Sequence, residues 1–172
     1  ADGGAVDSTT AAHSKVTDFN TMGAQATAVD LSTAAKVAAS TVLGDTDVLQ
    51  LDFENTNSID QAIAIEGDAT ATAGQAANTT YTVTNGILEL AGNGAAAVDT
   101  LAEWLTEAAA VAATDGELLA FEFGGDTYLF GQNDTEDLLI ELDGVTGVDG
   151  LLELTTTFST ALTNVVTFID IA

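Results

Sequence analysis

The chain has 172 residues, 47% of them hydrophobic, and carries 27 Asp and Glu against two Lys and no Arg, giving a formal net charge of −25. So acidic a chain has almost nothing with which to neutralise phosphates, which argues against nucleic acid and anionic membrane surfaces as partners. The absence of Cys excludes disulfides, zinc–thiolate sites and thiol nucleophiles, and no apolar run reaches the roughly 18 residues of a membrane helix.

Residues 1–14 are small and polar, and we interpret them as a flexible or donated N-terminal arm ahead of a single β-rich domain over residues 15–172. The segment Asp45–Phe53 predicts a strand, because Leu49, Leu51 and Phe53 alternate with more polar positions. A turn-forming acidic and amide loop follows it, Ile63 and Ile65 predict a second short strand, and Gly67–Asn78, rich in Ala, Thr and Gly, is expected to be a loop.

A hairpin and a helix follow. Over Thr79–Leu90, Asn85-Gly86 supplies the two positive φ angles that a type I′ turn requires, so we expect two antiparallel strands. Over residues 99–113, Thr100 and Glu103 fit a capping box, and apolar residues recur at helical spacing. Trp104, the only tryptophan, is expected to fill the core beneath a sheet rather than to bind a ligand.

The strongest strand pattern is Leu118–Leu142, in which two strands surround Gly124-Gly125 and a third follows an acidic loop. Its expected inward rows are Leu119, Phe121 and Phe123, then Tyr128 and Phe130, then Leu138, Ile140 and Leu142. Further strands are expected near the end of the chain. The pattern predicts a mainly β domain, an antiparallel β-sandwich or β-roll of about 8–10 short strands with one covering helix.

The inventory of side chains argues against an enzyme. One His, two Lys and no Cys or Arg leave few general bases, nucleophiles or oxyanion clamps. His13 lies among Ser, Thr and Ala residues and is expected to be a surface residue. A carboxylate pair for glycoside hydrolysis stays open, but with 27 acids any particular pair is uninformative.

Calcium is the favoured cofactor, because Ca²⁺ takes six to eight oxygen ligands and oxygen-rich loops flank the predicted strands. The alternative is an acidic surface that is simply hydrated, in a salt-rich environment. No loop has EF-hand spacing. The candidate metal ligands lie in three groups, Asp45 and Asp47, then Asp52, Glu54, Asn55, Asn57 and Asp60, and finally Asn133, Asp134, Glu136 and Asp137.

Two strings carry a family resemblance. FEFGGDTYLF at Phe121–Phe130 and DLLIELDGV at Asp137–Val145 resemble the C-terminal region of RTX-like proteins exported by type I secretion, of the surface-layer and calcium-binding alphaproteobacterial kind. VTDF at Val16–Phe19 and the final FIDIA resemble other parts of that region. The resemblance implies export, folding triggered by external calcium and structural roles. The tandem nonapeptide repeats of that group are missing, so its calcium ligands are not transferred to this chain.

We therefore expect a secreted structural protein, extracellular or on the cell surface, that self-assembles into a filament or surface layer and is stabilised by calcium. Its partners would be copies of itself and a cell-surface polysaccharide. Residues 1–14 and the terminal strand Asn164–Ala172 are the candidates for pairing with a neighbour's sheet; the alternative is that both pack within their own subunit. A second hypothesis is a C-terminal secretion and folding module of a larger adhesin, and a third is an extracellular hydrolase domain.

Overall fold

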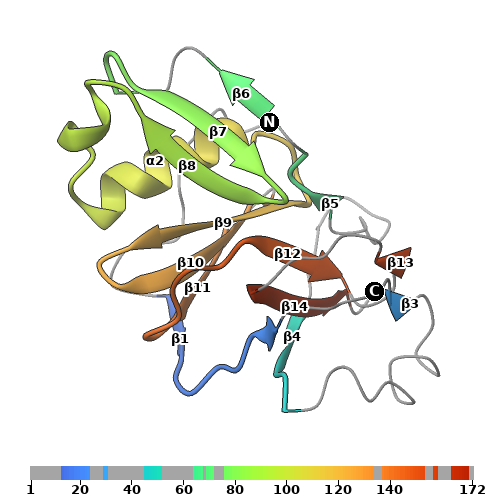
Figure 1. Ribbon diagram of the computed structural model, residues 1–172. Helices are drawn as coiled ribbons and strands as arrows, with labels where there is room; N and C mark the ends of the chain where they lie inside the picture. The colour runs from blue at the N-terminus through green and yellow to red at the C-terminus, as the bar shows by residue number, and fades with distance from the viewer. Residues whose placement is uncertain are drawn as a thin grey trace.

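A computed structural model describes residues 13–23, 29–30, 45–51, 64–67, 69–71, 76–133, 137–153, 157–158 and 164–170. These residues form an eight-stranded sheet, a four-stranded sheet, a two-stranded pair and one α-helix (Figure 1). The predicted mainly β sandwich with one covering helix is confirmed. The structure has more strands than the expected 8–10, because it includes several strands of only two or three residues that the sequence pattern did not predict. No helix within the described ranges is long and apolar enough to cross a membrane.

The large sheet is mixed rather than purely antiparallel. Its central hairpins pair antiparallel, whereas β1 runs parallel to β11, and both β5 and β8 run parallel to β9. In spatial order its strands are β1 (Ser14–Val16), β11 (Leu138–Leu142), β10 (Asp126–Gly131), β9 (Glu117–Phe123), β8 (Ile87–Ala91), β7 (Thr80–Thr84) and β6 (Ala69–Ala71), with β5 (Ala64–Ile65) also on β9.

The small sheet is built around β14 (Asn164–Asp170). β14 has β12 (Gly150–Glu153) on one side, and β2 (Met22–Gly23) and β4 (Val48–Leu51) on the other. With both edges occupied, this strand packs within its own subunit, so the expectation that it pairs with a neighbour is not supported. The separate two-stranded pair consists of β3 (Val29–Asp30) and β13 (Thr157–Phe158).

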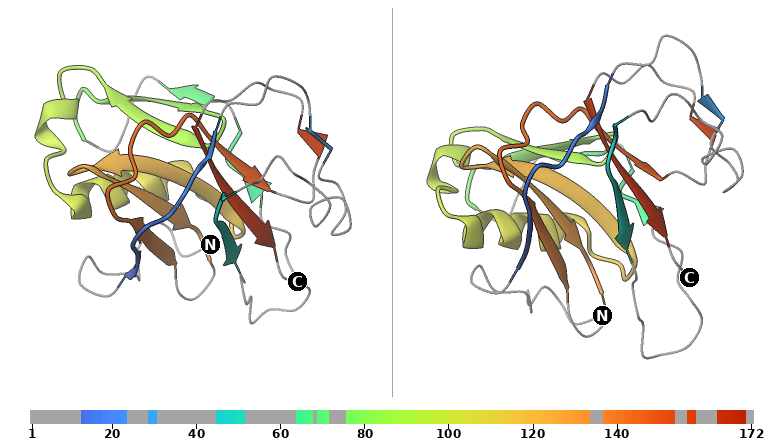
Figure 2. Two further views of the ribbon diagram at one scale, coloured as in Figure 1. Left: turned by 60° about the horizontal axis from the view of Figure 1, so that its bottom comes forward. Right: turned by 90° about the horizontal axis from the view of Figure 1, so that it is seen from below.

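The large sheet has a different cover on each face. One face packs against α2 (Leu101–Val111), and the other packs against β12, β14 and β4 of the small sheet (Figure 2). Alternation along each strand sends neighbouring side chains to opposite cores. The helix-side core includes Leu119, Phe121, Tyr128, Phe130 and Leu139; the other includes Leu118, Leu129, Ile140, Leu142, Val166 and Phe168.

The predicted hairpin at Asn85-Gly86 is confirmed. Asn85 has φ 51° and Gly86 has φ 82°, as a type I′ turn requires. The turn also joins the two sheets, because Leu151 N donates to Asn85 O at 3.0 Å. A Cβ on Gly86 would lie 2.6 Å from Ile65 Cγ2 and 3.0 Å from Leu151 Cδ1, so only glycine fits here.

The predicted helix is confirmed, with both ends two residues inside the expected range. Thr100 and Glu103 form the capping box, each side chain bonding the other residue's backbone N–H. Trp104 is half-buried and stacks on Phe121, with ring centroids 5.2 Å apart. The buried Glu107 accepts a hydrogen bond from Ala76 N at 2.6 Å and so fixes the segment that leads into β7.

Candidate functional site at the β1 edge

The edge of the large sheet is closed by a strand from far away in the sequence. β1 pairs with β11 in parallel register, so that Ser14 faces Ile140 and Val16 faces Leu142. Asp143 N donates to Val16 O at 2.9 Å, extending the ladder by one bond. The three-residue β1 therefore protects the outer edge of β11, which would otherwise offer unpaired N–H and C=O groups.

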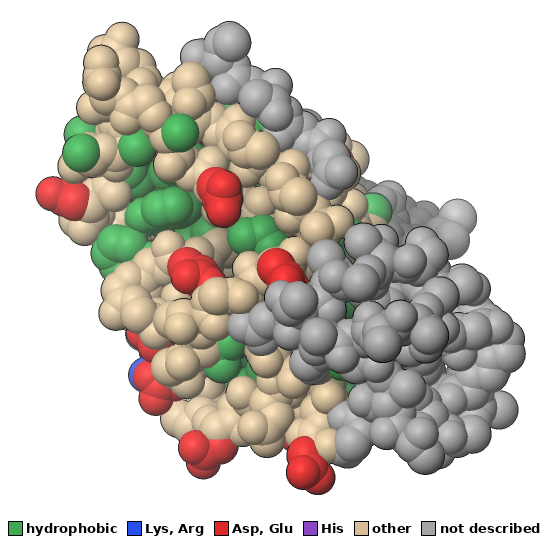
Figure 3. Space-filling view, in the orientation of Figure 1, with side chains coloured by type: hydrophobic (Ala, Val, Ile, Leu, Met, Phe, Trp, Pro, Cys, Tyr) green, Lys and Arg blue, Asp and Glu red, His purple; other side chains and the backbone are tan. Residues whose placement is uncertain are grey.

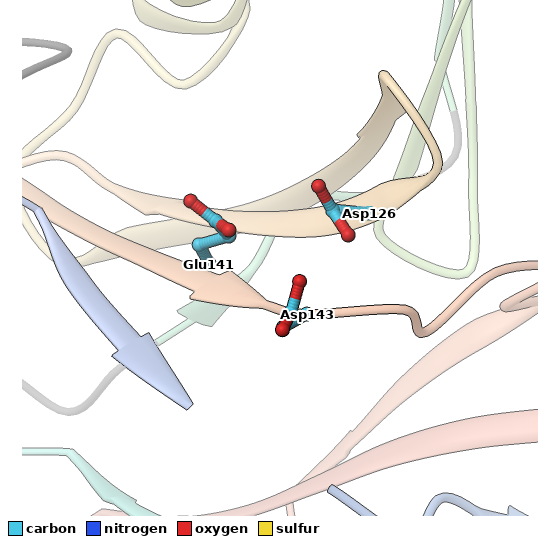
Figure 4. A group of neighbouring side chains, drawn as sticks. All are labelled: Asp126, Glu141 and Asp143. Atoms are coloured by element: carbon cyan, nitrogen blue, oxygen red, sulfur yellow. The ribbon is translucent and has the colours of Figure 1, made fainter. Parts of the chain in front are cut away.

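Three carboxylates gather beside this edge. Asp126 opens β10, Glu141 lies on β11 and Asp143 follows β11 (Figure 4). Because Tyr128 pairs with Glu141, residues two positions away on each strand lie on the same face, which brings Asp126 and Asp143 alongside. Their carboxylate oxygens lie within 4.8 Å of one another, in the single acidic cluster of this kind among the described residues.

The positive charge of Lys15 offsets part of the negative charge of this cluster. Its Nζ donates to Glu141 Oε1 at 2.5 Å and to Asp143 Oδ1 at 2.8 Å. The Glu141 side chain is only 9% exposed, and His13 Nε2 donates to its second oxygen. The hydrogen bond from Lys15 is the main cause that holds the pKa of Glu141 below its ordinary value, and the bond from His13 acts in the same direction. The two carboxylates in turn raise the pKa of Lys15.

An aromatic series connects this edge to the helix. The ring of His13 lies edge-on to Tyr128 at 5.9 Å, Tyr128 stacks on Phe121 at 5.5 Å, and Phe121 stacks on Trp104. Burial, with the negative charge of Glu141, raises the pKa of the Tyr128 hydroxyl. β1 is thus attached by backbone pairing, ionic contacts and ring contacts.

The cluster has suitable chemistry for a hard divalent cation but already contains a cation. Carboxylate oxygens are the ligands that Ca²⁺ prefers. However, Lys15 bonds two of the three carboxylates, and Gly144 N donates to Asp126 Oδ1 at 2.7 Å. A calcium ion with all three side chains as ligands would have to displace the ammonium group of Lys15.

The sequence-predicted ligands that the structure describes do not belong to this cluster. Asp47 is a structural link: its Oδ2 accepts from Asn20 N at 2.9 Å, and its carbonyl accepts from Thr167 Oγ1. Asp45 is exposed at the start of the same segment. Asp52, Glu54, Asn55, Asn57 and Asp60 lie outside the described residues.

In the third predicted group, the described acid Asp137 also has a structural role. Asp137 is buried, and its Oδ1 accepts from Gln132 Nε2 at 3.0 Å and from Asn133 N at 3.2 Å. These bonds close the loop between β10 and β11. Asp134 and Glu136 lie outside the described residues.

The sequence contained part of the signal for the observed cluster. Glu141 and Asp143 sit two residues apart and so share one face of their strand. Asp126 joins them only through the register of β10 against β11, which the Gly124-Gly125 turn between β9 and β10 does not set. Lys15 and His13 could not have been found in this way, because no local pattern indicates that β1 pairs with β11. His13, expected as a surface residue, is half-buried instead.

Comparisons with protein-family models, with curated proteins and with solved structures return no match for this chain.

Proposed function

We propose that this chain is a non-catalytic, secreted structural protein that assembles with copies of itself into an extracellular filament or surface layer. The observation that carries the proposal is the β1 edge. A strand of three residues, more than 120 positions away from its partner in sequence, closes the outer strand of an eight-stranded sheet. Such a strand can form the same bonds with a neighbouring copy, which is the principle of strand exchange.

The contacts of β1 support strand exchange between copies, because a small number of specific contacts fixes its position on β11. The parallel register, the bonds from Lys15 and the bond from His13 define where β1 docks. None of them depends on whether β1 and β11 belong to one chain. Exchange between copies would therefore conserve the contacts, and would change only the path of the segment that follows β1.

The hinge of this exchange is Asp18, in the segment that follows β1. Thr17, Asp18 and Asn20 are exposed, whereas Phe19 is buried in the core shared with the small sheet. Asp18 has φ 63°, a left-handed conformation that costs a non-glycine residue free energy. A straightened path at Asp18 would relieve this strain and direct β1 away from its own subunit, while Phe19 keeps the following chain anchored.

Calcium stabilisation and contact with a cell-surface polysaccharide belong to the same proposal. Support for calcium comes from the net charge of −25, since divalent cations reduce the repulsion among carboxylates. Among the described residues, Asp126, Glu141 and Asp143 are the ligands we propose. Calcium bound there would compete with the ammonium group of Lys15 for Glu141 and Asp143.

Deletion of residues 1–16 tests the proposal. The truncated chain should fold, because its two cores keep nearly all their buried residues, yet it should fail to assemble. Electron microscopy and sedimentation of the intact and truncated chains, each with calcium and with chelator, give the readout. Assembly of the truncated chain into the same polymers would contradict the role of β1, and an intact chain that stays monomeric with and without calcium would contradict self-assembly itself.

A further inference from the structure

The large sheet opens between β8 and β9. The two strands run parallel but pair at a single position, Ile87 with Ala120, and then diverge (Figure 1). A cavity of about 470 Å³ lies along this opening. Its lining includes Leu88 and Leu90 of β8, Glu122 of β9, Val148 of the loop before β12, and Trp104 of α2. We call this cavity the β8–β9 slit.

The slit has an apolar base and an acidic mouth. Leu88, Leu90 and Trp104 belong to the helix-side core, so they lie at the base, on the α2 side of the sheet. Glu89 and Glu122 are exposed at the opposite side, one on each wall. Figure 3 shows the hollow from its open side, with hydrophobic side chains at its base and acidic side chains around it.

Backbone groups also face the slit. Ala120 N donates to Gly86 O at 2.8 Å, so Ala120 directs its backbone groups toward β8. Strand residues two positions apart direct their N–H and C=O to the same side. Glu122 on β9 and Leu90 on β8 therefore direct theirs into the slit, beyond the last pair of this register. Donors and acceptors of both kinds thus line a cavity with an indole at its base.

We infer that the β8–β9 slit binds a neutral saccharide unit of a glycan chain. A hexose has an apolar C–H face, which suits the indole and leucine base, and hydroxyl groups around its rim, which donate well to carboxylates. The volume falls within the range of about 300–1,000 Å³ that is usual for small-molecule sites. This gives a location to the polysaccharide partner of the proposed function and rests on that part of it alone.

Other ligand classes fit less well. An anionic ligand would meet two carboxylates on a chain of net charge −25. A metal ion would find two carboxylates on opposite walls, and among the described residues the one group of three acids within reach of an ion is at the β1 edge instead. An added β-strand needs a constant spacing of about 4.8 Å to its neighbour, whereas the walls of the slit converge at Ile87 and Ala120.

The only tryptophan of the chain lines the slit, so its fluorescence reports directly on occupancy. The intact chain is titrated with maltohexaose, cellohexaose and laminarihexaose, and separately with tetramethylammonium chloride and an uncharged Ala/Thr octapeptide. The variants are E89Q and E122Q, with D45N as a control that removes one exposed charge elsewhere. E122Q retains an oxygen for the bond that Glu122 Oε1 accepts from Val148 N, and near-UV circular dichroism checks its fold.

The inference predicts a saturable change of Trp104 fluorescence with at least one oligosaccharide. It also predicts affinity about tenfold weaker in E89Q and E122Q, as for loss of a hydrogen bond to a charged acceptor, and unchanged affinity in D45N. A response confined to the cation or the peptide, or no response to any probe, would overturn it. Light scattering of the same samples records assembly, so a chain that assembles without binding saccharide separates this failure from that of self-assembly.

Discussion

Lys15 is the residue on which the β1 edge depends most. It is one of two lysines in a chain with 27 acids, and its ammonium group bonds both Glu141 and Asp143. Without it, Glu141 would lose its ion pair while facing two further carboxylates at close range. Like charges so close repel strongly when one of them is largely removed from water.

The K15M substitution should therefore loosen β1 and open the acidic cluster to cations. We expect faster amide exchange at positions 15 and 16 in low salt. We also expect calorimetry to show tighter calcium binding, because no ammonium group competes with the ion. K36M makes the same change of charge at the other lysine and serves as the control. Equal calcium affinity in K15M and K36M would refute calcium binding at Asp126, Glu141 and Asp143.

The pKa of Glu141 gives a pH dependence with a definite sign. Its pKa in the folded state lies below the ordinary 4.5, first because Lys15 bonds it. A lowered carboxyl pKa contributes stability that is present above 4.5 and is lost as the pH falls through the folded-state value. The titratable groups that face Glu141 are Lys15 on β1, His13 just before it, Tyr128 and Asp126 on β10, and Asp143 after β11.

We accordingly expect β1 to stay docked at pH 5 and to detach well below pH 4.5. Amide exchange of β1, corrected for the intrinsic pH dependence of exchange, measures this. In E141Q the transition should disappear, because the glutamine does not titrate. Persistence of the same transition in E141Q would assign it to other carboxyls.

At the scale of elements, the β7–β8 turn connects the two sheets as well as two strands. Gly86 needs a positive φ and also lies where a side chain would strike Ile65 and Leu151. Gly124, in the β9–β10 turn, has φ 69° but no atom within 4 Å of an added Cβ. The two glycines thus share the backbone requirement and differ in packing.

Alanine at each position separates these effects. G124A should cost about 1–2 kcal/mol of unfolding free energy, the usual strain of a left-handed residue. G86A should cost about 2 kcal/mol more, because the methyl group must push apart the contact between the sheets. Denaturant unfolding measures both, and equal losses would show that the turn does not depend on the packing of Ile65 and Leu151.

Local elements were predictable because their signals are local. The Asn85-Gly86 turn, the capping box at Thr100 and the alternating rows of β9, β10 and β11 all follow from residues within a few positions of one another. The pairing of β1 with β11, and the splayed pairing of β8 with β9, join distant segments and leave no periodic trace. The acidic cluster was missed because its assembly depends on the register of β10 against β11, although two of its members are two residues apart in sequence.

At the scale of the whole molecule, the two strands proposed from the sequence for pairing between copies occupy different positions. β14 is enclosed by strands on both sides, whereas β1 is an edge strand that leads into the strained Asp18. Exchange of β1 would convert a closed subunit into one that both donates and accepts a strand. A polymer of such subunits would grow by repeating the same β1–β11 interface at each addition.

Substitutions at Asp18 should shift this balance in opposite directions. D18P forbids the positive φ and should favour the exchanged, assembled form; D18G accepts it and should favour the closed monomer. Sedimentation velocity at fixed protein and calcium concentrations gives the distribution. Identical distributions for D18P and D18G would show that this linker is not the hinge.

The most direct measurement is a disulfide between copies, since the chain has no cysteine of its own. Ser14 and Ile140 are register partners, and S14C and I140C are prepared as separate chains, mixed, assembled and oxidised. We predict a linked species of twice the 17.4 kDa chain mass on a non-reducing gel. Assembled mixtures that stay unlinked, while the S14C/I140C double variant closes within one chain, would contradict strand exchange.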